Sequence, residues 1–207
     1  MIKNPYPGKF IVFEGLDGSG KSTQAALLVK ELKEKRCKVH ATFEPTQYLI
    51  GGLVRSYLAN DWKSAPECLQ LMFCADRAYH LEKEIVPSLK AGVTVVCDRY
   101  FFSTVAYGAM DMDLKWLIEL NKNFIIPDLT IVLESDPELC IERMAKERFS
   151  VELFEKIGIL KKIWKNYQIV AKKFSSTANV KIINGDREIP EIFEEVKKIF
   201  QTFKKNK

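Results

Sequence analysis

One eight-residue segment constrains the fold of this chain more than any other feature. Residues 15–22 read Gly-Leu-Asp-Gly-Ser-Gly-Lys-Ser and fit the pattern G-x-x-x-x-G-K-[ST] at every fixed position. The apolar run at residues 10–13 predicts a strand directly before the segment, and apolar side chains at helical spacing predict a helix over residues 22–36. The segment is therefore expected to turn the chain from a strand into a helix.

A glycine-rich turn in this position is suited to bind phosphate. Glycines allow consecutive backbone N–H groups to turn inward around an anion, and the beginning of the helix adds the positive end of its dipole. Lys21 can reach the β- and γ-phosphate oxygens of a nucleotide, and the hydroxyl of Ser22 can ligate Mg²⁺. The strand before the turn and the helix after it favour this function over a purely structural turn.

Apolar runs and helical patterns alternate about five times along the rest of the chain. Strands are expected at residues 10–13, 39–43, 93–97, 129–133 and 180–183, and helices at residues 22–36, 51–60, 66–90, 113–124, 137–146, 151–174 and 189–203. Pro87 should kink or end the long helical stretch. The alternation predicts an α/β fold, in which a parallel sheet of about five strands has helices on both faces. Without a repeat or a long linker, residues 1–207 are expected to form a single domain.

The composition is that of an ordinary globular protein. Hydrophobic residues make up 47% and charged residues 29%, which excludes a disordered or collagen-like chain. No apolar stretch reaches the roughly 18 residues of a membrane span, and the first ten residues lack an apolar signal core. We therefore expect a cytoplasmic protein without a membrane partner. The cysteines lack C-x-x-C spacing, which predicts free thiols rather than zinc or disulfides: Cys37, Cys68, Cys74, Cys97 and Cys140.

The net charge of +5 does not by itself indicate a nucleic-acid partner. Much of the surplus comes from five lysines near the C-terminus, at positions 197, 198, 204, 205 and 207. Such a basic tail is more often the solvated end of a helix than a binding surface. We therefore expect a small anionic ligand rather than DNA or RNA.

Two charged residues follow the apolar run at residues 93–97. Ligands of open α/β sheets bind at the carboxyl ends of the strands. This rule places Asp98 near Mg²⁺ and Arg99 near a phosphate group. A surface ion pair is the alternative for the two side chains.

Arginines and an aromatic residue elsewhere could complete a second site. Arg77 lies within an apolar helical stretch and needs an acceptor. Phe73 lies four residues earlier on the same face, and a ring beside a guanidinium group suits a flat base. The alternatives are a core position for Phe73 and, for Arg77, a structural ion pair with Asp76, Glu82 or another carboxylate.

Arg143 and Arg148 straddle the expected end of a helix. A cationic hairpin there could close over a transferring phosphate and exclude water. Helical periodicity alone favours a solvated charged face instead.

Taken together, the chain resembles the thymidylate kinases, which phosphorylate dTMP to dTDP with MgATP. The resemblance runs from about residue 10 to residue 183. It is carried by Phe13-Glu14-Gly15 and the rest of the loop to Thr23, Glu44-Pro45, Arg55-Ser56-Tyr57-Leu58, Phe73-Cys74-Ala75-Asp76-Arg77-Ala78, Asp98-Arg99-Tyr100 with Ser103 and Ala106-Tyr107, Pro127-Asp128-Leu129-Thr130, and Asp136-Pro137-Glu138.

The resemblance implies a P-loop NTPase-type nucleoside monophosphate kinase fold with a short lid at about residues 146–152, a homodimer, and Mg²⁺ as cofactor. It implies ATP binding by Gly15, Gly18, Ser19, Gly20, Lys21, Ser22, Thr23 and Arg143, and metal binding by Ser22 and Asp98. It implies catalytic roles for Lys21, Arg99, Arg148 and Asp17.

For dTMP, the resemblance implies one role per residue. Asp17 would bind the 3′-hydroxyl, Arg55 and Arg99 the 5′-phosphate, and Tyr107 would crowd C2′ and disfavour ribose. Phe73 would stack on the thymine, Arg77 would donate to O4, and Ser103 and Thr104 would line the base pocket. Gly18 stands where some relatives carry arginine, which implies that the lid supplies the catalytic cation.

Two other functions remain open. A deoxynucleoside kinase, or a monophosphate kinase with another base specificity, would share this architecture. A nucleoside acceptor would need a carboxylate base, for which Glu44 is available. A nucleotide-binding protein without transferase activity is the second alternative, and the presence of Lys21, Asp98 and Arg99 argues against it.

Overall fold

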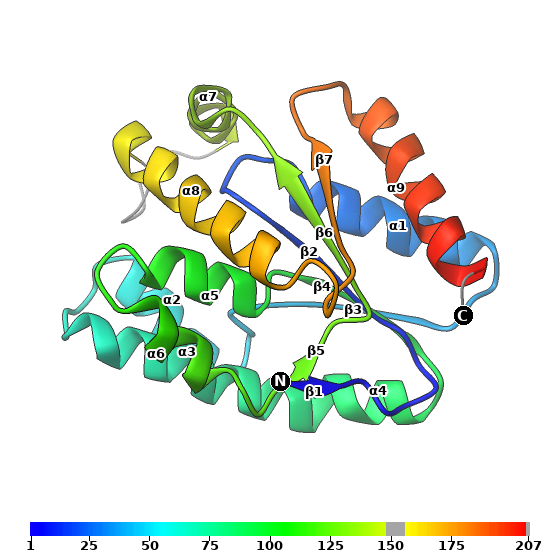
Figure 1. The fold of residues 1–207 in the computed structure, drawn as a ribbon, viewed down its shortest axis with the longest axis horizontal. Helices are drawn as coiled ribbons and strands as arrows, with labels where there is room; N and C mark the ends of the chain where they lie inside the picture. The colour runs from blue at the N-terminus through cyan, green and yellow to red at the C-terminus, as the bar shows by residue number, and fades with distance from the viewer. Residues whose placement is uncertain (148–155, 206–207) are drawn as a thin grey trace.

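A computed structural model describes residues 1–147 and 156–205 of the chain. Its centre is a parallel sheet of five strands in the order β3-β4-β2-β6-β7 (Figure 1). The strands are β2 (Phe10–Gly15), β3 (Val39–Phe43), β4 (Thr94–Asp98), β6 (Leu129–Glu134) and β7 (Val180–Asn184). All five lie within two residues of the expected positions, and the predicted α/β architecture is confirmed.

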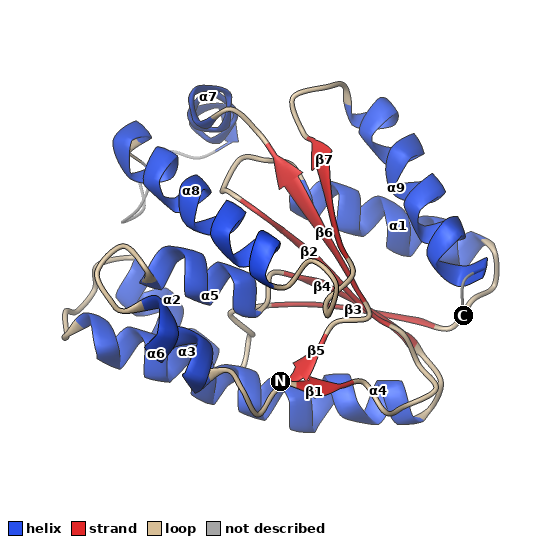
Figure 2. Ribbon diagram, viewed as in Figure 1, coloured by secondary structure: helices blue, strands red, loops and turns tan. Residues whose placement is uncertain are grey.

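Helices cover both faces of the sheet, which explains why its central strands are continuous apolar runs. Helices α1 (Lys21–Glu34) and α9 (Ile189–Lys205) lie together on one side, and α5 (Phe101–Gly108) and α8 (Ile157–Lys173) lie on the other (Figure 2). Alternate residues of β2 serve the two cores: Ile11 and Phe13 pack toward α1 and α9, whereas Phe10 and Val12 face the α5 and α8 side.

The long helical stretch predicted at residues 66–90 changes its helix type shortly before Pro87. It consists of α3 (Pro66–His80), a π-helical turn η1 (Leu81–Ile85) and α4 (Val86–Lys90). The α-helical hydrogen-bond pattern is interrupted directly before Pro87, which lies in the first turn of α4, so the disturbance that the proline predicts is present although the chain stays helical. Proline lacks the N–H group and crowds the carbonyl four residues earlier, and the π turn, with its i→i+5 hydrogen bonds, lies directly before it.

The remaining described elements are α2 (Leu49–Leu58), α6 (Leu114–Leu120), α7 (Pro137–Glu147), and the short pair β1 (Ile2–Lys3) and β5 (Ile125–Ile126). The pair β1–β5 and helix α5 were not predicted. The expected lid at residues 146–152 and the start of the helix predicted at residues 151–174 fall largely outside the described residues. No helix among the described residues is long and apolar enough to cross a membrane.

Candidate active site

The phosphate loop runs from the end of β2 to the beginning of α1. Gly15, Gly18 and Gly20 have φ values of 147°, 77° and 86°, in the region that side chains disfavour. Gly20 is the N-cap of α1 and offers no side chain to the first helical N–H groups. These N–H groups and the positive end of the helix dipole are therefore available for an anion.

Helix α7 packs closely against this loop. A Cβ atom on Gly18 would lie 2.3 Å from the carbonyl oxygen of Cys140. Arg143, on the same helix, donates to the carbonyl oxygen of Gly185 at 2.9 Å and approaches that of Gly18 at 3.5 Å. The expected ATP-binding arginine thus lies beside the loop, whereas Arg148 lies outside the described residues.

Lys21 is buried at the base of the loop. Its Nζ donates to the carbonyl oxygen of Leu16 at 3.3 Å and lies 3.6 Å from Oδ1 of Asp17. Burial, together with the charge of Arg99, lowers the pKa of Lys21, and Asp17 and Asp98 oppose this shift. The ammonium group is therefore a desolvated cation whose attraction to phosphate is little screened by water.

Ser22 and Asp98 meet across the gap between α1 and the end of β4. The Ser22 hydroxyl hydrogen-bonds Oδ2 of Asp98, and Oδ1 of Asp98 is buried without a partner among the described residues. Thr23, the next residue of α1, is exposed. A hydroxyl beside a carboxylate with a spare oxygen fits Mg²⁺, which keeps water and phosphate oxygens as its other ligands.

Asp17, Arg99 and Tyr107 form one polar cluster between the loop and α5. Oδ1 of Asp17 accepts from Nη2 of Arg99 at 2.5 Å, and Oδ2 accepts from the Tyr107 hydroxyl at 2.8 Å. Burial would raise the pKa of Asp17, but Arg99 and Lys21 outweigh it and hold this pKa well below its usual value. Arg99 has a φ of 67°, a backbone conformation that non-glycine residues reach only when the surroundings enforce it.

Glu14, which the sequence reasoning assigned no role, holds α5 in place. Its carboxylate accepts from the backbone N–H groups of Tyr100 at 2.9 Å and Ser103 at 3.3 Å. The hydroxyls of Ser103 and Tyr167 donate to it at 2.5 Å and 3.2 Å. Burial raises the pKa of Glu14 to about 7, although the Ser103 hydrogen bond and the charge of Arg99 oppose this shift. The sequence did carry a signal for this role, because Glu14 is the one charged residue of the otherwise apolar strand β2 and lies next to the loop motif.

Arg77 is fully buried and already holds several partners. Its Nε and Nη2 donate to Oε2 of Glu44 at 2.9 and 2.6 Å, Nη2 also to Thr104 at 2.8 Å, and Nη1 to Asn121 at 2.5 Å. Arg77 therefore forms the structural ion pair that the sequence left open as an alternative, and its partner is Glu44. Asp76 instead accepts from the N–H and hydroxyl groups of Thr46.

The other predicted dTMP-binding residues lie on α2, α3 and α5. Phe73 is half-buried on α3, and Ser103 lies on α5 within hydrogen-bond distance of Arg99, at 2.9 Å. Arg55 is exposed on α2 and donates to the backbone carbonyl groups of Pro45 and Thr46. The two arginines predicted to bind the 5′-phosphate thus come from different segments, Arg55 from α2 and Arg99 from the position directly after β4.

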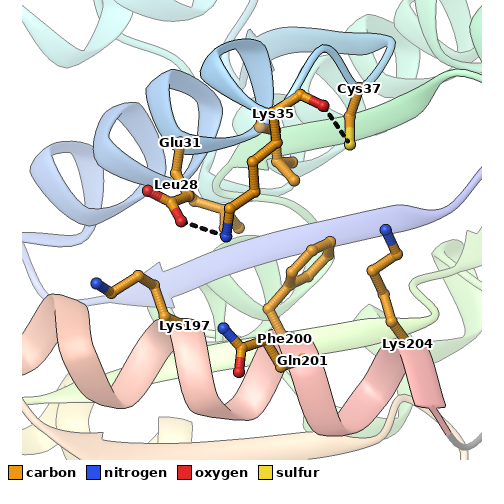
Figure 3. A pocket seen from close by; sticks show the side chains of 9 residues that line it. Leu28, Glu31, Lys35, Cys37, Lys197, Phe200, Gln201 and Lys204 are labelled. Atoms are coloured by element: carbon orange, nitrogen blue, oxygen red, sulfur yellow. Dashed lines mark hydrogen bonds and ion pairs between the residues drawn. The ribbon is translucent and has the colours of Figure 1, made fainter.

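A separate hollow of about 110 Å³ between α1 and α9 is not part of this site (Figure 3). It lies at the C-terminal end of α1, opposite the end that carries Lys21. Glu31 and Lys35 form an ion pair at 2.5 Å on its wall. The lining residues are Leu28, Glu31, Leu32, Lys35, Cys37, Lys197, Phe200, Gln201 and Lys204. Lys197 and Lys204 of α9 thus flank an apolar floor.

Comparison with known proteins agrees with this geometry. The family model described as "Thymidylate kinase" matches residues 13–196. The chain belongs to the thymidylate kinase family. It is 39% identical over 197 residues to a probable thymidylate kinase of Thermococcus onnurineus, covering 90% of this chain and 94% of the relative. A probable thymidylate kinase of Pyrococcus horikoshii is also 39% identical, covering 91% and 94% of the two chains. The thymidylate kinase of Caldicellulosiruptor saccharolyticus is 35% identical, covering 97% and 99%.

Proposed function

We propose that this thymidylate kinase family member transfers the γ-phosphoryl group of ATP to the 5′-phosphate of dTMP, giving dTDP and ADP. One observation carries the proposal. A single carboxylate, that of Asp17, contacts Arg99 and Tyr107 on the acceptor side and faces Lys21 of the phosphate loop. Donor and acceptor sites therefore meet in one ionic cluster, as transfer between two phosphates requires.

On the donor side, the phosphate loop would hold the β- and γ-phosphates of ATP. Lys21 and the N-terminus of α1 supply positive charge there, and Arg143 lies beside the loop. Ser22 and Asp98 would hold Mg²⁺, which would neutralise charge between the β- and γ-phosphates when bound. These contacts position the donor in line with its acceptor.

On the acceptor side, the dTMP phosphate would bind Arg99 while the thymine lies between α3 and α5. The acceptor oxygen is already anionic, so the reaction needs no general base. Positioning and neutralisation of charge therefore carry the catalysis. Arg99 is held for this purpose by Asp17 and Ser103.

The structure favours a monophosphate acceptor over a nucleoside. The nucleoside alternative relied on Glu44 as a base, but Glu44 is buried and forms ion pairs with Arg77 at 2.6 Å and, if that ring is protonated, His80 at 3.1 Å. A carboxylate engaged on both oxygens is poorly placed to remove a proton from a sugar hydroxyl.

We further propose that the protein acts in the cytoplasm as a homodimer. Five free cysteines suit a reducing compartment. Leu49 and Leu53 of α2 and Leu71 of α3 are exposed on two helices that pack together, which supports an apolar contact with a second copy. Light scattering of the purified chain would test the dimer.

A panel of acceptors tests the activity. The full chain would be incubated with MgATP and dTMP, dUMP, dCMP, dAMP, dGMP, thymidine or deoxycytidine, and the products separated by ion-exchange chromatography. We expect dTDP to form fastest. Preferential phosphorylation of a nucleoside would favour the deoxynucleoside kinase alternative, and ATP binding without transfer to any acceptor would contradict an enzymatic function.

A further inference from the structure

Three residues of α3 lie on one face of the helix, and two of them, Phe73 and Arg77, are predicted to bind the base. Gln70, Phe73 and Arg77 are three and four residues apart, so their side chains lie one above the other along the helix. Gln70 and Arg77 are 3% and 1% exposed. Polar side chains with this degree of burial need hydrogen-bond partners.

Arg77 has little capacity left for a base. A guanidinium group has five N–H donors. Glu44 takes two of them, Thr104 one and Asn121 one. The single remaining N–H, on Nη1, can satisfy one carbonyl oxygen of a pyrimidine, whereas thymine offers two carbonyls and the N3–H group between them.

Gln70, in contrast to Arg77, has an unused hydrogen-bonding atom. Its side-chain oxygen Oε1 is buried and has no hydrogen-bond partner among the described residues. A buried acceptor without a donor is costly, and such a group in a native structure calls for an explanation. A ligand that brings an N–H donor would provide one.

The space around Gln70 is suited to such a ligand. Gln70 lines a cavity of about 260 Å³ together with Leu69, Tyr107 and Gly108. A Cβ atom on Gly108 would lie 2.9 Å from Cδ and 3.0 Å from Oε1 of Gln70. The missing side chain at position 108 thus makes room for the amide beside Tyr107, the residue that contacts Asp17.

We propose that Gln70 is a specificity-determining residue that reads the imide edge of the thymine, and this inference rests on the proposed function. Oε1 would accept a hydrogen bond from N3–H, and the amide nitrogen would donate to the neighbouring O2. The spare N–H of Arg77 would donate to O4. Cytosine presents an unprotonated N3 and an amino group at C4, so both positions have reversed polarity and the site would reject it.

The test compares wild type with Gln70→Met, which keeps the length of the side chain and removes the amide. The values of kcat and KM would be measured for dTMP, dUMP, dCMP and thymidine 5′-monophosphate methylated at N3. We expect the ratio of kcat/KM for dTMP over dCMP to fall roughly ten- to a hundredfold in the variant, mainly through the KM of dTMP. The ratio of dTMP over dUMP should not change, because both bases carry the same imide.

A matched control removes another buried glutamine. Gln24 on α1 is 1% exposed and its Oε1 also lacks a partner among the described residues, but it does not line this cavity. Gln24→Met should leave the dTMP over dCMP ratio unchanged.

The N3-methylated substrate tests the same contact in wild type, even if Gln70→Met fails to fold. Wild type should use it at least tenfold less well than dTMP. Equal use of the two substrates, or an unchanged dTMP over dCMP ratio in a folded Gln70→Met variant, would overturn the role of Gln70 while leaving dTMP kinase activity intact. If wild type forms no dTDP at all, the proposed function fails and the role of Gln70 fails with it.

Discussion

Asp17 and Arg99 form an ion pair with an Oδ1–Nη2 distance of 2.5 Å between the phosphate loop and the beginning of α5. Because Asp17 also lies 3.6 Å from Nζ of Lys21, one carboxylate balances two cations that we propose to bind different substrates. The shared carboxylate fixes the geometry of the donor site relative to the acceptor site, so its charge should matter more to transfer than to the binding of either substrate alone.

Asp17→Asn should therefore lower kcat/KM for dTMP by about two orders of magnitude, since displacing a positioned group by about 1 Å has an effect of that size. Steady-state kinetics with a coupled ADP assay would measure it. Asp61→Asn, which changes an exposed carboxylate, is the control and should behave as wild type. Retention of more than half of wild-type kcat/KM by Asp17→Asn would argue against a shared positioning role.

Lys21→Ala should lower kcat by about two to three orders of magnitude, because charge that develops on the transferring phosphoryl group loses its nearest buried cation. Single-turnover kinetics at saturating ATP would separate this effect from weaker binding. Calorimetric titration with ATP should show that the variant still binds nucleotide through the loop N–H groups. Near-normal turnover would remove Lys21 from the catalytic residues.

Tyr107→Ala should improve the use of UMP relative to dUMP about tenfold or more, because the ring is expected to crowd C2′ of the sugar. The Tyr107 hydroxyl also donates to Asp17, so Tyr107→Phe serves as the matched control that removes the hydroxyl and keeps the ring. We expect Tyr107→Phe to keep the wild-type preference for deoxyribose. An unchanged UMP to dUMP ratio in Tyr107→Ala would show that the ring does not exclude the 2′-hydroxyl.

The strands and the phosphate loop were predictable because their signals are local. Continuous apolar runs predict strands covered on both faces, and the glycine positions of the loop match the positive φ values of Gly15, Gly18 and Gly20. By contrast, α5 was missed because residues 101–108 are rich in aromatic and β-branched residues, which have low helix propensity. Its beginning depends on Glu14, a residue 86 positions before Tyr100 in the chain.

The hydrogen-bond partners of buried charged residues also could not be predicted from the sequence. Arg77 was expected to seek an acceptor, but the spacing along α3 could not select Glu44 on a different segment. Side-chain pairs that are 33 residues apart depend on the tertiary fold, because no helical or strand periodicity connects them. The sequence therefore predicted which residues need partners, and the fold determined which partners they have.

Gly18→Ala should destabilise the protein and disturb the position of α7. The added Cβ would lie 2.3 Å from the Cys140 carbonyl oxygen, and Gly18 has a φ of 77°. Gly92→Ala is a matched control, because Gly92 has a φ of 72° but no atom within 4 Å of the added Cβ. Backbone strain alone should cost about 1 to 2 kcal/mol in both variants. Thermal unfolding should show a clearly larger loss for Gly18→Ala, and equal losses would mean that α7 moves freely away from the loop.

Glu14→Gln should remove a pH dependence of stability between about pH 4.5 and pH 7. The pKa of Glu14 rises from 4.5 to about 7 in the folded protein because burial penalises the carboxylate. Between these values the unfolded chain releases a proton that the folded protein keeps. The free energy of unfolding therefore falls as the pH rises through this range, and levels off above it.

The total change attributable to Glu14 amounts to at most roughly 3 kcal/mol, at 1.36 kcal/mol per pKa unit. Urea unfolding of wild type and Glu14→Gln at several pH values would measure the difference between their free energies of unfolding. Groups that titrate alike in both proteins do not contribute to this difference. Asp17 does not interfere, because its pKa is lowered and it titrates below this range. We expect the advantage of wild type over Glu14→Gln to be largest near pH 4.5 and smallest above pH 7. A difference that stays constant with pH would mean that Glu14 titrates alike in the folded and unfolded chains.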